Sequence, residues 1–228
     1  MRINNTNSLK KLCPKIFTSF DIEEEEIIDE EKEGLKQEKI IQGFFPKYMH
    51  YFNGKLHDSY VLQIQEKKDS FVLSLNDIVF VDFSQALSNI KSVPFNSDLY
   101  KFELKFSFEN VEVKAFYDVD DKGKLKEISL KEMLSICQEW LDEEIIFVSD
   151  EYIELAIHLW GKRQNNNESI LLIKARKMKI EENQMKVWKL IFGNEYDLLV
   201  KEFIRLRKEG KYFDLNESEI FIRNFYKI

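Results

Sequence analysis

The chain has 228 residues, of which 44% are hydrophobic and 33% are charged, and its formal net charge is −7. Its 19 phenylalanines, set against seven glycines and three prolines, exclude a largely disordered chain and supply one sizeable core. We therefore expect a single domain over residues 1–228.

Long apolar segments are missing from the sequence. No apolar run approaches the roughly 20 residues that a membrane-spanning helix requires, and the first residues lack the apolar stretch of a signal peptide. The two cysteines, Cys13 and Cys137, form no CxxC pair and have no metal-type spacing. These features predict a cytoplasmic protein that has no membrane partner.

The first segment, residues 1–53, is expected to be helical. Isoleucines and leucines recur at roughly helical intervals over 22–42, with Asp21 as the N-cap. Gly34 is expected to interrupt or weaken this helix. A second, short helix is predicted over 46–52, with a proline in its first turn.

Negative charge is concentrated in residues 21–33, which hold nine acidic residues and one lysine, a local charge of −8. One interpretation is a solvated helix that packs its isoleucines inward, since most helices gain their stability in this way. The other is a negative surface that attracts a basic protein partner, with Glu23, Glu24, Glu25 and Glu26 as the candidate binding residues.

The second segment, residues 54–182, has the alternating pattern of strands. A hairpin is predicted over 60–75, with Tyr60, Leu62 and Ile64 on one face of its first strand. A short helix over 131–140 is expected to interrupt the strands. The further strands are predicted over 78–83, 101–108, 143–150, 152–161 and 169–180.

The last segment, residues 183–228, returns to a helical period. One helix is predicted to carry an apolar stripe that includes Leu198 and to end at Gly210. A final short helix is predicted with Asn216 as its N-cap, in a pattern close to a capping box. Helices at both ends of about seven to nine antiparallel strands predict an α+β fold, with an antiparallel sheet or a partly closed barrel.

The stretch GKLHDSYVLQIQ, residues 54–65, puts His57, Asp58 and Ser59 side by side before a strand. Adjacent side chains of an extended segment point to opposite faces, whereas a catalytic triad needs three groups that converge. We expect a structural polar corner, in which Asp58 or Ser59 hydrogen-bonds the first N–H groups of the strand and His57 lies at the sheet edge. The alternative is half of a metal site, used by a metal-assisted hydrolase.

Glycine patterns exclude the common nucleotide-binding loops, because neither GxGxxG nor GxxxxGK[ST] occurs. The turn at 118–123 resembles the beginning of a calcium loop. However, a lysine occupies its fifth position and a serine its twelfth, so a hairpin turn is predicted there instead. We therefore predict no cofactor and no bound metal.

The last part of the chain is basic, with thirteen Lys or Arg against nine Asp or Glu from residue 171 onward. The runs KARKMK, 174–179, and RLRKEGK, 205–211, make nucleic-acid binding a third hypothesis. Nearby glutamates offset much of this charge, so a solvated surface is the preferred interpretation. Nucleic acid is accordingly not an expected partner.

Residues 47–76 resemble a group of uncharacterised bacterial proteins in which a Leu-His-Asp-Ser or Leu-His-Asp-Ala motif opens the first of several antiparallel strands. The matching residues are Leu56, His57, Asp58 and Ser59. The resemblance implies a sheet-containing fold and no established activity, and similar motifs occur in candidate immunity proteins of bacterial toxin systems. We expect a non-catalytic protein-interaction module, of the immunity type, that binds a basic partner.

Overall fold

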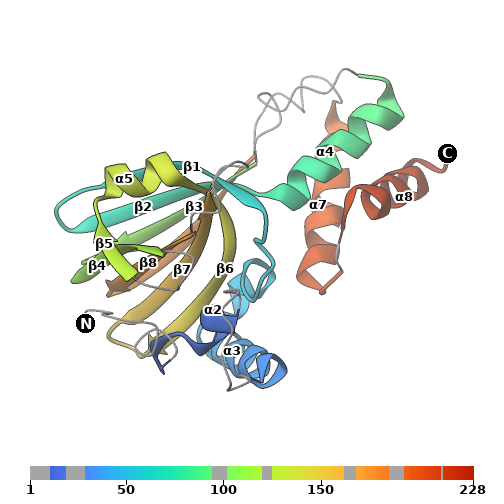
Figure 1. Cartoon of the computed structure of the whole chain (residues 1–228). Helices are drawn as coiled ribbons and strands as arrows, with labels where there is room; N and C mark the ends of the chain where they lie inside the picture. The colour runs from blue at the N-terminus through green and yellow to red at the C-terminus, as the bar shows by residue number, and fades with distance from the viewer. Residues whose placement is uncertain are drawn as a thin grey trace.

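The computed structural model of the chain describes residues 11–18, 29–93, 102–119, 125–161, 168–184, 193–211 and 213–228. Its centre is a nine-stranded sheet in which neighbouring strands are antiparallel (Figure 1). Helices precede, interrupt and follow the strands. This arrangement confirms the predicted α+β fold with a partly closed antiparallel sheet.

The strands pair in the order β5-β4-β8-β7-β6-β1-β2-β3-β9. Their bounds are β1 (Ser59–Glu66), β2 (Ser70–Asn76), β3 (Phe102–Glu109), β4 (Val113–Val119), β5 (Leu125–Ile128), β6 (Cys137–Val148), β7 (Ile153–Gly161), β8 (Glu168–Ala175) and β9 (Lys177–Gln184). The helices are α2 (Pro14–Thr18), α3 (Glu30–Phe44), the 3-10 helix η1 (Pro46–Tyr51), α4 (Ile78–Lys91), α5 (Leu130–Ile136), α7 (Asn194–Lys208) and α8 (Leu215–Tyr226).

A sharp bend makes the sheet curl. Strands β8 and β9 follow one another in the chain, yet β8 pairs with β4 and β7 whereas β9 pairs with β3. At the bend the Arg176 N–H donates to Glu109 O at 3.1 Å, and the Glu112 N–H donates to Lys174 O at 2.9 Å. Asn110 completes the bend in the left-handed region, at φ 52°. The prediction of one continuous strand over 169–180 is therefore wrong.

The run at 78–83 forms the start of helix α4, so the predicted strand is wrong. Asp77 caps this helix, because its carboxylate accepts the Val79 N–H at 3.1 Å. The buried positions of α4 include Val79, Phe83 and Ala86, which recur at helical spacing. A short run that is apolar at nearly every position does not distinguish a strand from a buried helix by its periodicity.

The first long helix begins later than predicted. Asp29 is the N-cap of α3 and accepts the Lys32 N–H at 3.0 Å, so the helix does not run unbroken from residue 22. It continues through Gly34, so the helix is not interrupted there. The expected N-cap, Asp21, lies outside the described residues. The short helix after Pro46 is present as η1, in the 3-10 form.

The first hairpin is confirmed, but the predicted face of β1 is wrong. A bulge in the β1–β2 pairing between Val61 and Gln63 shifts the alternation of side chains. Tyr60 and Leu62 are consequently exposed, whereas Val61 and Ile64 pack against the core.

Three predicted details of the helices also change. The helix predicted over 131–140 ends at Ile136, because Trp140 belongs to β6. The capping box of α8 uses Asp214 and Glu217 in place of Asn216. On α7, which ends as predicted just before Gly210, Leu198 points outward and is 62% exposed.

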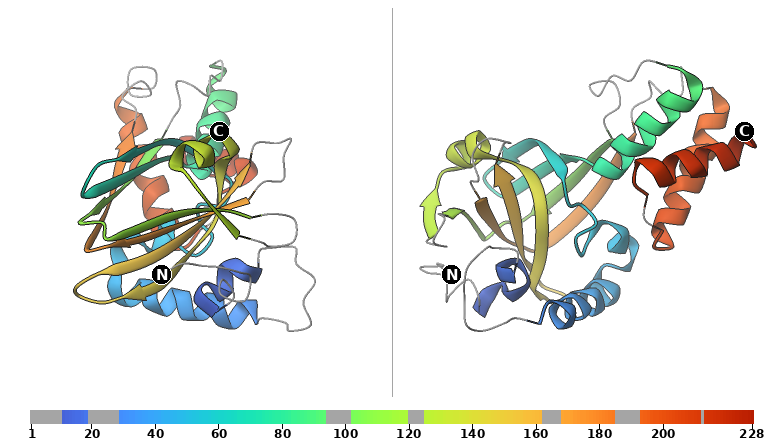
Figure 2. Two further views of the ribbon diagram at one scale, coloured as in Figure 1. Left: turned by 60° about the vertical axis from the view of Figure 1, so that its left-hand side comes forward. Right: turned by 45° about the vertical axis from the view of Figure 1, so that its right-hand side comes forward.

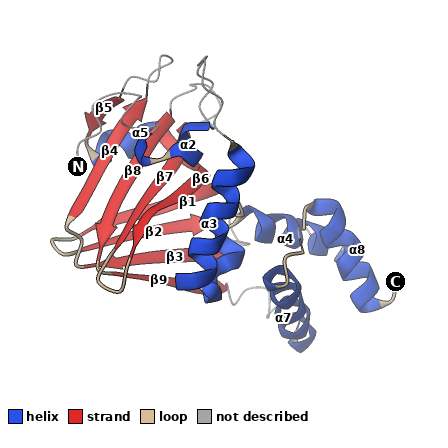
Figure 3. Ribbon diagram, turned by 90° about the horizontal axis from the view of Figure 1, so that it is seen from below, coloured by secondary structure: helices blue, strands red, loops and turns tan. Residues whose placement is uncertain are grey.

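One hydrophobic cluster contains side chains of all three predicted segments, among them Ile41, Phe106 and Phe203. The rings of Phe83 and Phe203 lie 4.3 Å apart between their centroids and join α4 to α7. Each fully buried phenylalanine stabilises the fold by about 1.5–3 kcal/mol. Helices α4, α7 and α8 form a group beside the sheet, whereas α3 runs across the strands (Figures 2 and 3).

The described helices include none that is both long enough and apolar enough to cross a membrane.

Candidate functional site

The Leu-His-Asp-Ser corner uses its polar groups to join elements of the fold. Asp58 has a left-handed backbone, at φ 63°, and its N–H donates to Trp140 O at 2.9 Å. Ser59 is buried, and its hydroxyl accepts the Ile78 N–H at the start of α4, at 3.3 Å. The hydroxyl therefore serves the beginning of a helix, whereas we had expected it to serve the first N–H groups of β1.

His57 lies at the surface, where its side chain is 57% exposed. Its Nδ1 is 2.8 Å from Leu141 O, and its Nε2 is 3.5 Å from a carboxylate oxygen of Asp58. The expected position at the sheet edge is wrong, because β1 pairs with both β2 and β6. Over the described ranges, no three His, Cys, Asp or Glu side chains are placed to hold a metal.

The four candidate partner-binding glutamates, Glu23, Glu24, Glu25 and Glu26, lie outside the described residues.

Much of the charge in the basic run at 174–179 is paired with acidic neighbours. Lys174 lies 3.1 Å from Glu112, and Lys179 lies 2.5 Å from Glu181. These lysines lower the pKa of Glu112 and Glu181 through hydrogen bonds and charge. This run is consequently a largely balanced surface.

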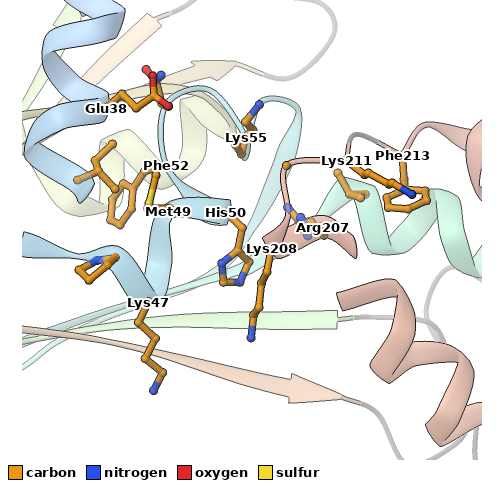
Figure 4. Close-up of a pocket in the computed structure, with 15 residues that line it drawn as sticks. Glu38, Lys47, Met49, His50, Phe52, Lys55, Arg207, Lys208, Lys211 and Phe213 are labelled. Atoms are coloured by element: carbon orange, nitrogen blue, oxygen red, sulfur yellow. The ribbon is translucent and has the colours of Figure 1, made fainter. Parts of the chain in front are cut away.

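A second group of cations lines a cleft of about 540 Å³ between η1 and the end of α7. Figure 4 shows this cleft with its lining side chains. One carboxylate, that of Glu38, stands among the described residues of the wall. We call this cleft the basic cleft. The cations of its wall are Lys47, Lys55, Arg207, Lys208 and Lys211.

Arg207 is held rigidly in the wall of the basic cleft. Its side chain is 6% exposed, and its Nη1 donates to the fully buried carboxylate of Asp77. The guanidinium carbon lies 5.3 Å from the ring centroid of Tyr51 and 5.6 Å from that of Phe80. The other terminal nitrogen, Nη2, is buried and has no hydrogen-bond partner among the described residues. Arg207 is one of the residues that line the cleft, and one donor of this buried cation is thus left unsatisfied.

His50, Tyr51 and Glu182 form a network next to Arg207. The Tyr51 hydroxyl donates to Glu182 at 2.6 Å, and the His50 Nε2 lies 3.6 Å from the same oxygen. Burial lowers the pKa of His50, and the charges of Lys208 and Arg207 act in the same direction. His50, followed by the Tyr51 hydroxyl, lowers the pKa of Glu182 to about 2 against the opposing effect of burial. At neutral pH the imidazole is therefore neutral and the carboxylate is ionised.

A buried carboxylate shapes the rim of the cleft. Glu143 accepts the N–H groups of Asn53 and Gly54 with one oxygen and the Trp140 indole N–H, at 2.8 Å, with the other. Asn53 and Gly54 both have left-handed backbones, at φ 62° and 76°. The tight turn that they form precedes Lys55, so Glu143 positions this lysine at the cleft.

Sequence reasoning missed the basic cleft. The run at 205–211 was recognised as basic, but its counterpart lies at 47–55, where the lysines stand apart and resemble ordinary surface residues. Only their shared position in the wall distinguishes them.

Comparison of the chain with protein-family models, with curated proteins and with solved structures gives no match.

Proposed function

We propose that this protein is a non-catalytic binding module that takes an anionic ligand into the basic cleft. The observation that carries the proposal is the excess of cations in the wall, five against one carboxylate. Lys47, Lys55, Lys208 and Lys211 have no ion-pair partner among the described residues. Like charges gathered around one cleft repel one another, and an anion in the cleft reduces this repulsion.

The side chains of the wall favour binding over chemistry. The described lining contains no serine, threonine or cysteine that could act as a nucleophile. Its histidine, His50, is kept neutral by burial and by the nearby cations. The proposal therefore retains the expected absence of catalysis but reverses the expected charge of the bound group.

Nucleic acid is not part of the proposal. Four lysines that have no ion-pair partner among the described residues line one concave cleft, and the other basic run carries ion pairs on Lys174 and Lys179. A nucleic-acid surface needs a continuous basic track along the phosphate backbone.

The test is a thermal unfolding experiment with inorganic pyrophosphate and with citrate, each compared with chloride at equal ionic strength. A ligand at about 100 times its Kd stabilises the folded state by about 2.7 kcal/mol. We expect at least one anion to raise the Tm of the wild type and of Lys201→Glu, which reverses an exposed charge of α7 outside the cleft. The double variant Lys208→Glu, Lys211→Glu should not respond. An equal response of this variant, or no response of the wild type, would refute the proposal.

The sequence favours a second candidate, an immunity-type inhibitor that binds a basic partner in the bacterial cytoplasm. Its support is the charge of −8 over residues 21–33 together with the resemblance at 47–76. Replacement of Glu23, Glu24, Glu25 and Glu26 by lysine should then weaken binding of an oligolysine peptide. Unchanged binding of the peptide would eliminate this candidate.

A further inference from the structure

The size of the basic cleft limits what can occupy it. Its volume of about 540 Å³ lies within the range of roughly 300–1,000 Å³ that is typical of small-molecule sites. The described lining comes from three parts of the chain, namely residues between 38 and 55, Val79, and residues 207–211 with Phe213. A concave, partly open space of this size suits a small molecule better than the flat or elongated surface of a macromolecule.

The charge of the wall favours a ligand with clustered negative charge. The described lining holds five cations and one carboxylate, and because Arg207 is paired with Asp77 the four lysines carry the excess of positive charge. The lowered pKa of His50 disfavours a further charge there. A phosphate monoester carries about −1.5 to −2 at this pH and offers three strong acceptor oxygens. A carboxylate carries a single charge and fewer acceptors. Within so small a volume, phosphate groups therefore neutralise the positive charge of the wall more readily than carboxylate groups do.

Arg207 provides a prepared contact for such a ligand. Its Nη1 is engaged by Asp77 while its Nη2 is buried without a partner, and Tyr51 and Phe80 hold the guanidinium in place. Arginine N–H groups match phosphate oxygens in geometry, and lysine ammonium groups bind phosphate as point charges. Lys208 follows Arg207 directly in the chain, and Figure 4 draws its side chain alongside His50.

We infer that the ligand of the basic cleft is a small molecule with clustered phosphate groups, held by the Nη2 of Arg207 and by the ammonium groups of Lys55, Lys208 and Lys211. This inference rests on the proposed function, which requires only an anion. The sequence has no glycine-rich phosphate loop, so cationic side chains take the part that backbone N–H groups play in such loops.

The experiment compares the affinities of inorganic pyrophosphate and citrate by isothermal titration calorimetry of the full chain at neutral pH. The two anions carry similar charge, so the comparison isolates the phosphate group. We expect pyrophosphate to bind about tenfold or more tightly than citrate, because its phosphate groups place more acceptor oxygens and charge close together than separate carboxylates do. Equal affinities would overturn the inference and leave the proposed function standing. Absence of binding by both anions would overturn the two together.

Variants of the cleft residues test which side chains contact the bound pyrophosphate. Lys208→Glu with Lys211→Glu changes two exposed residues and should reduce pyrophosphate affinity about tenfold or more, whereas Lys201→Glu should leave it unchanged. Arg207→Lys keeps a cation beside Asp77 but removes the second terminal nitrogen. It should reduce the preference for pyrophosphate over citrate, and an unchanged preference would remove Arg207 from the site. Circular dichroism of each variant confirms that it is folded before titration.

Discussion

The Leu-His-Asp-Ser corner and the basic cleft are adjacent in the chain and opposite in character. At the corner, Asp58 and Ser59 hydrogen-bond through the backbone or side chain to Trp140 and Ile78. In the cleft, Arg207 keeps an unsatisfied donor and four lysines lack an ion-pair partner in the described part of the chain. The corner contains the residue types of catalysis, whereas the wall of the cleft contains cationic groups that lack a partner in the described part of the chain.

This difference shows which observation is informative about function. A histidine beside a carboxylate occurs in both regions, as His57 with Asp58 and as His50 with Glu182. Buried polar groups are nearly always hydrogen-bonded, so an exception requires an explanation. For Arg207, we propose that a ligand supplies the missing acceptor.

The largest expected effect is a loss of unfolding free energy. It distinguishes Asp77, the counterion of Arg207 in the cleft, from Asp58 of the corner. Asp77→Asn keeps an acceptor for the Val79 N–H but leaves Arg207 buried without a counterion, so we expect a loss of about 3–5 kcal/mol in unfolding free energy. Asp58→Asn, at the exposed corner, should cost less than about 0.5 kcal/mol. Urea unfolding measures both variants. Similar losses would mean that the corner is as tightly coupled to the fold as the cleft.

Glu143, which holds the turn at Asn53 and Gly54, should make the unfolding free energy depend on pH. Burial, reinforced by Asp142, raises the pKa of Glu143 from 4.5 to about 7, so this carboxyl binds its proton more tightly in the folded state than in the unfolded state. Between these values the folded state carries the extra proton, and stability therefore falls as pH rises. The expected slope is at most about 1.4 kcal/mol for each pH unit.

Glu143→Gln provides the measurement for this dependence. Urea unfolding of the variant at several pH values should show a shallower decline than the wild type between about pH 4.5 and 7, because its side chain does not titrate. Glu144, whose pKa burial also raises to about 7, should preserve part of the decline. Glu151→Gln, at an exposed turn, is the control and should follow the wild type. A variant profile identical to that of the wild type would contradict the role given to Glu143.

A smaller effect distinguishes the residues within the corner. Ser59→Ala leaves the partly buried Ile78 N–H without its acceptor, and we expect a loss of about 1 kcal/mol. His57→Ala changes an exposed side chain and should cost less than about 0.5 kcal/mol. Chemical denaturation of the two variants tests this order. A larger loss for His57→Ala would show that the imidazole has a structural role beyond its contact with Leu141.

The smallest effect concerns the lysines of the cleft. Lys208→Glu and Lys211→Glu should each change the unfolding free energy by no more than about 0.5 kcal/mol, because both side chains are exposed and lack an ion-pair partner among the described residues. Unfolding at low and at high salt should also show that salt stabilises the wild type more than the double variant, since repulsion in the cleft is screened. A loss above about 1.5 kcal/mol would assign these lysines a structural role instead.

Local patterns predicted many elements correctly where one face of the element is polar. Strand β3 is such a case, because Leu104, Phe106 and Phe108 are buried and alternate with polar residues. The prediction of elements failed where a run was apolar at nearly every position. It also failed where a strand bends without a glycine or proline to mark the bend. The run at 78–83 is apolar at nearly every position, and no glycine or proline marks the bend at Arg176.

The chain's composition, alternating runs and helix ends were sufficient for an α+β protein with an antiparallel sheet between two helical segments, because these features depend on neighbours in the chain. Whether a charged residue has a counterion or hydrogen-bond partner depends on contacts with residues that lie far away in the chain. Arg207 finds its counterion 130 residues away, at Asp77. The lysines near residue 50 and near residue 210 become one cleft only when η1 and the end of α7 come together. The polar corner was therefore visible in the sequence, whereas the cleft existed only in the folded structure.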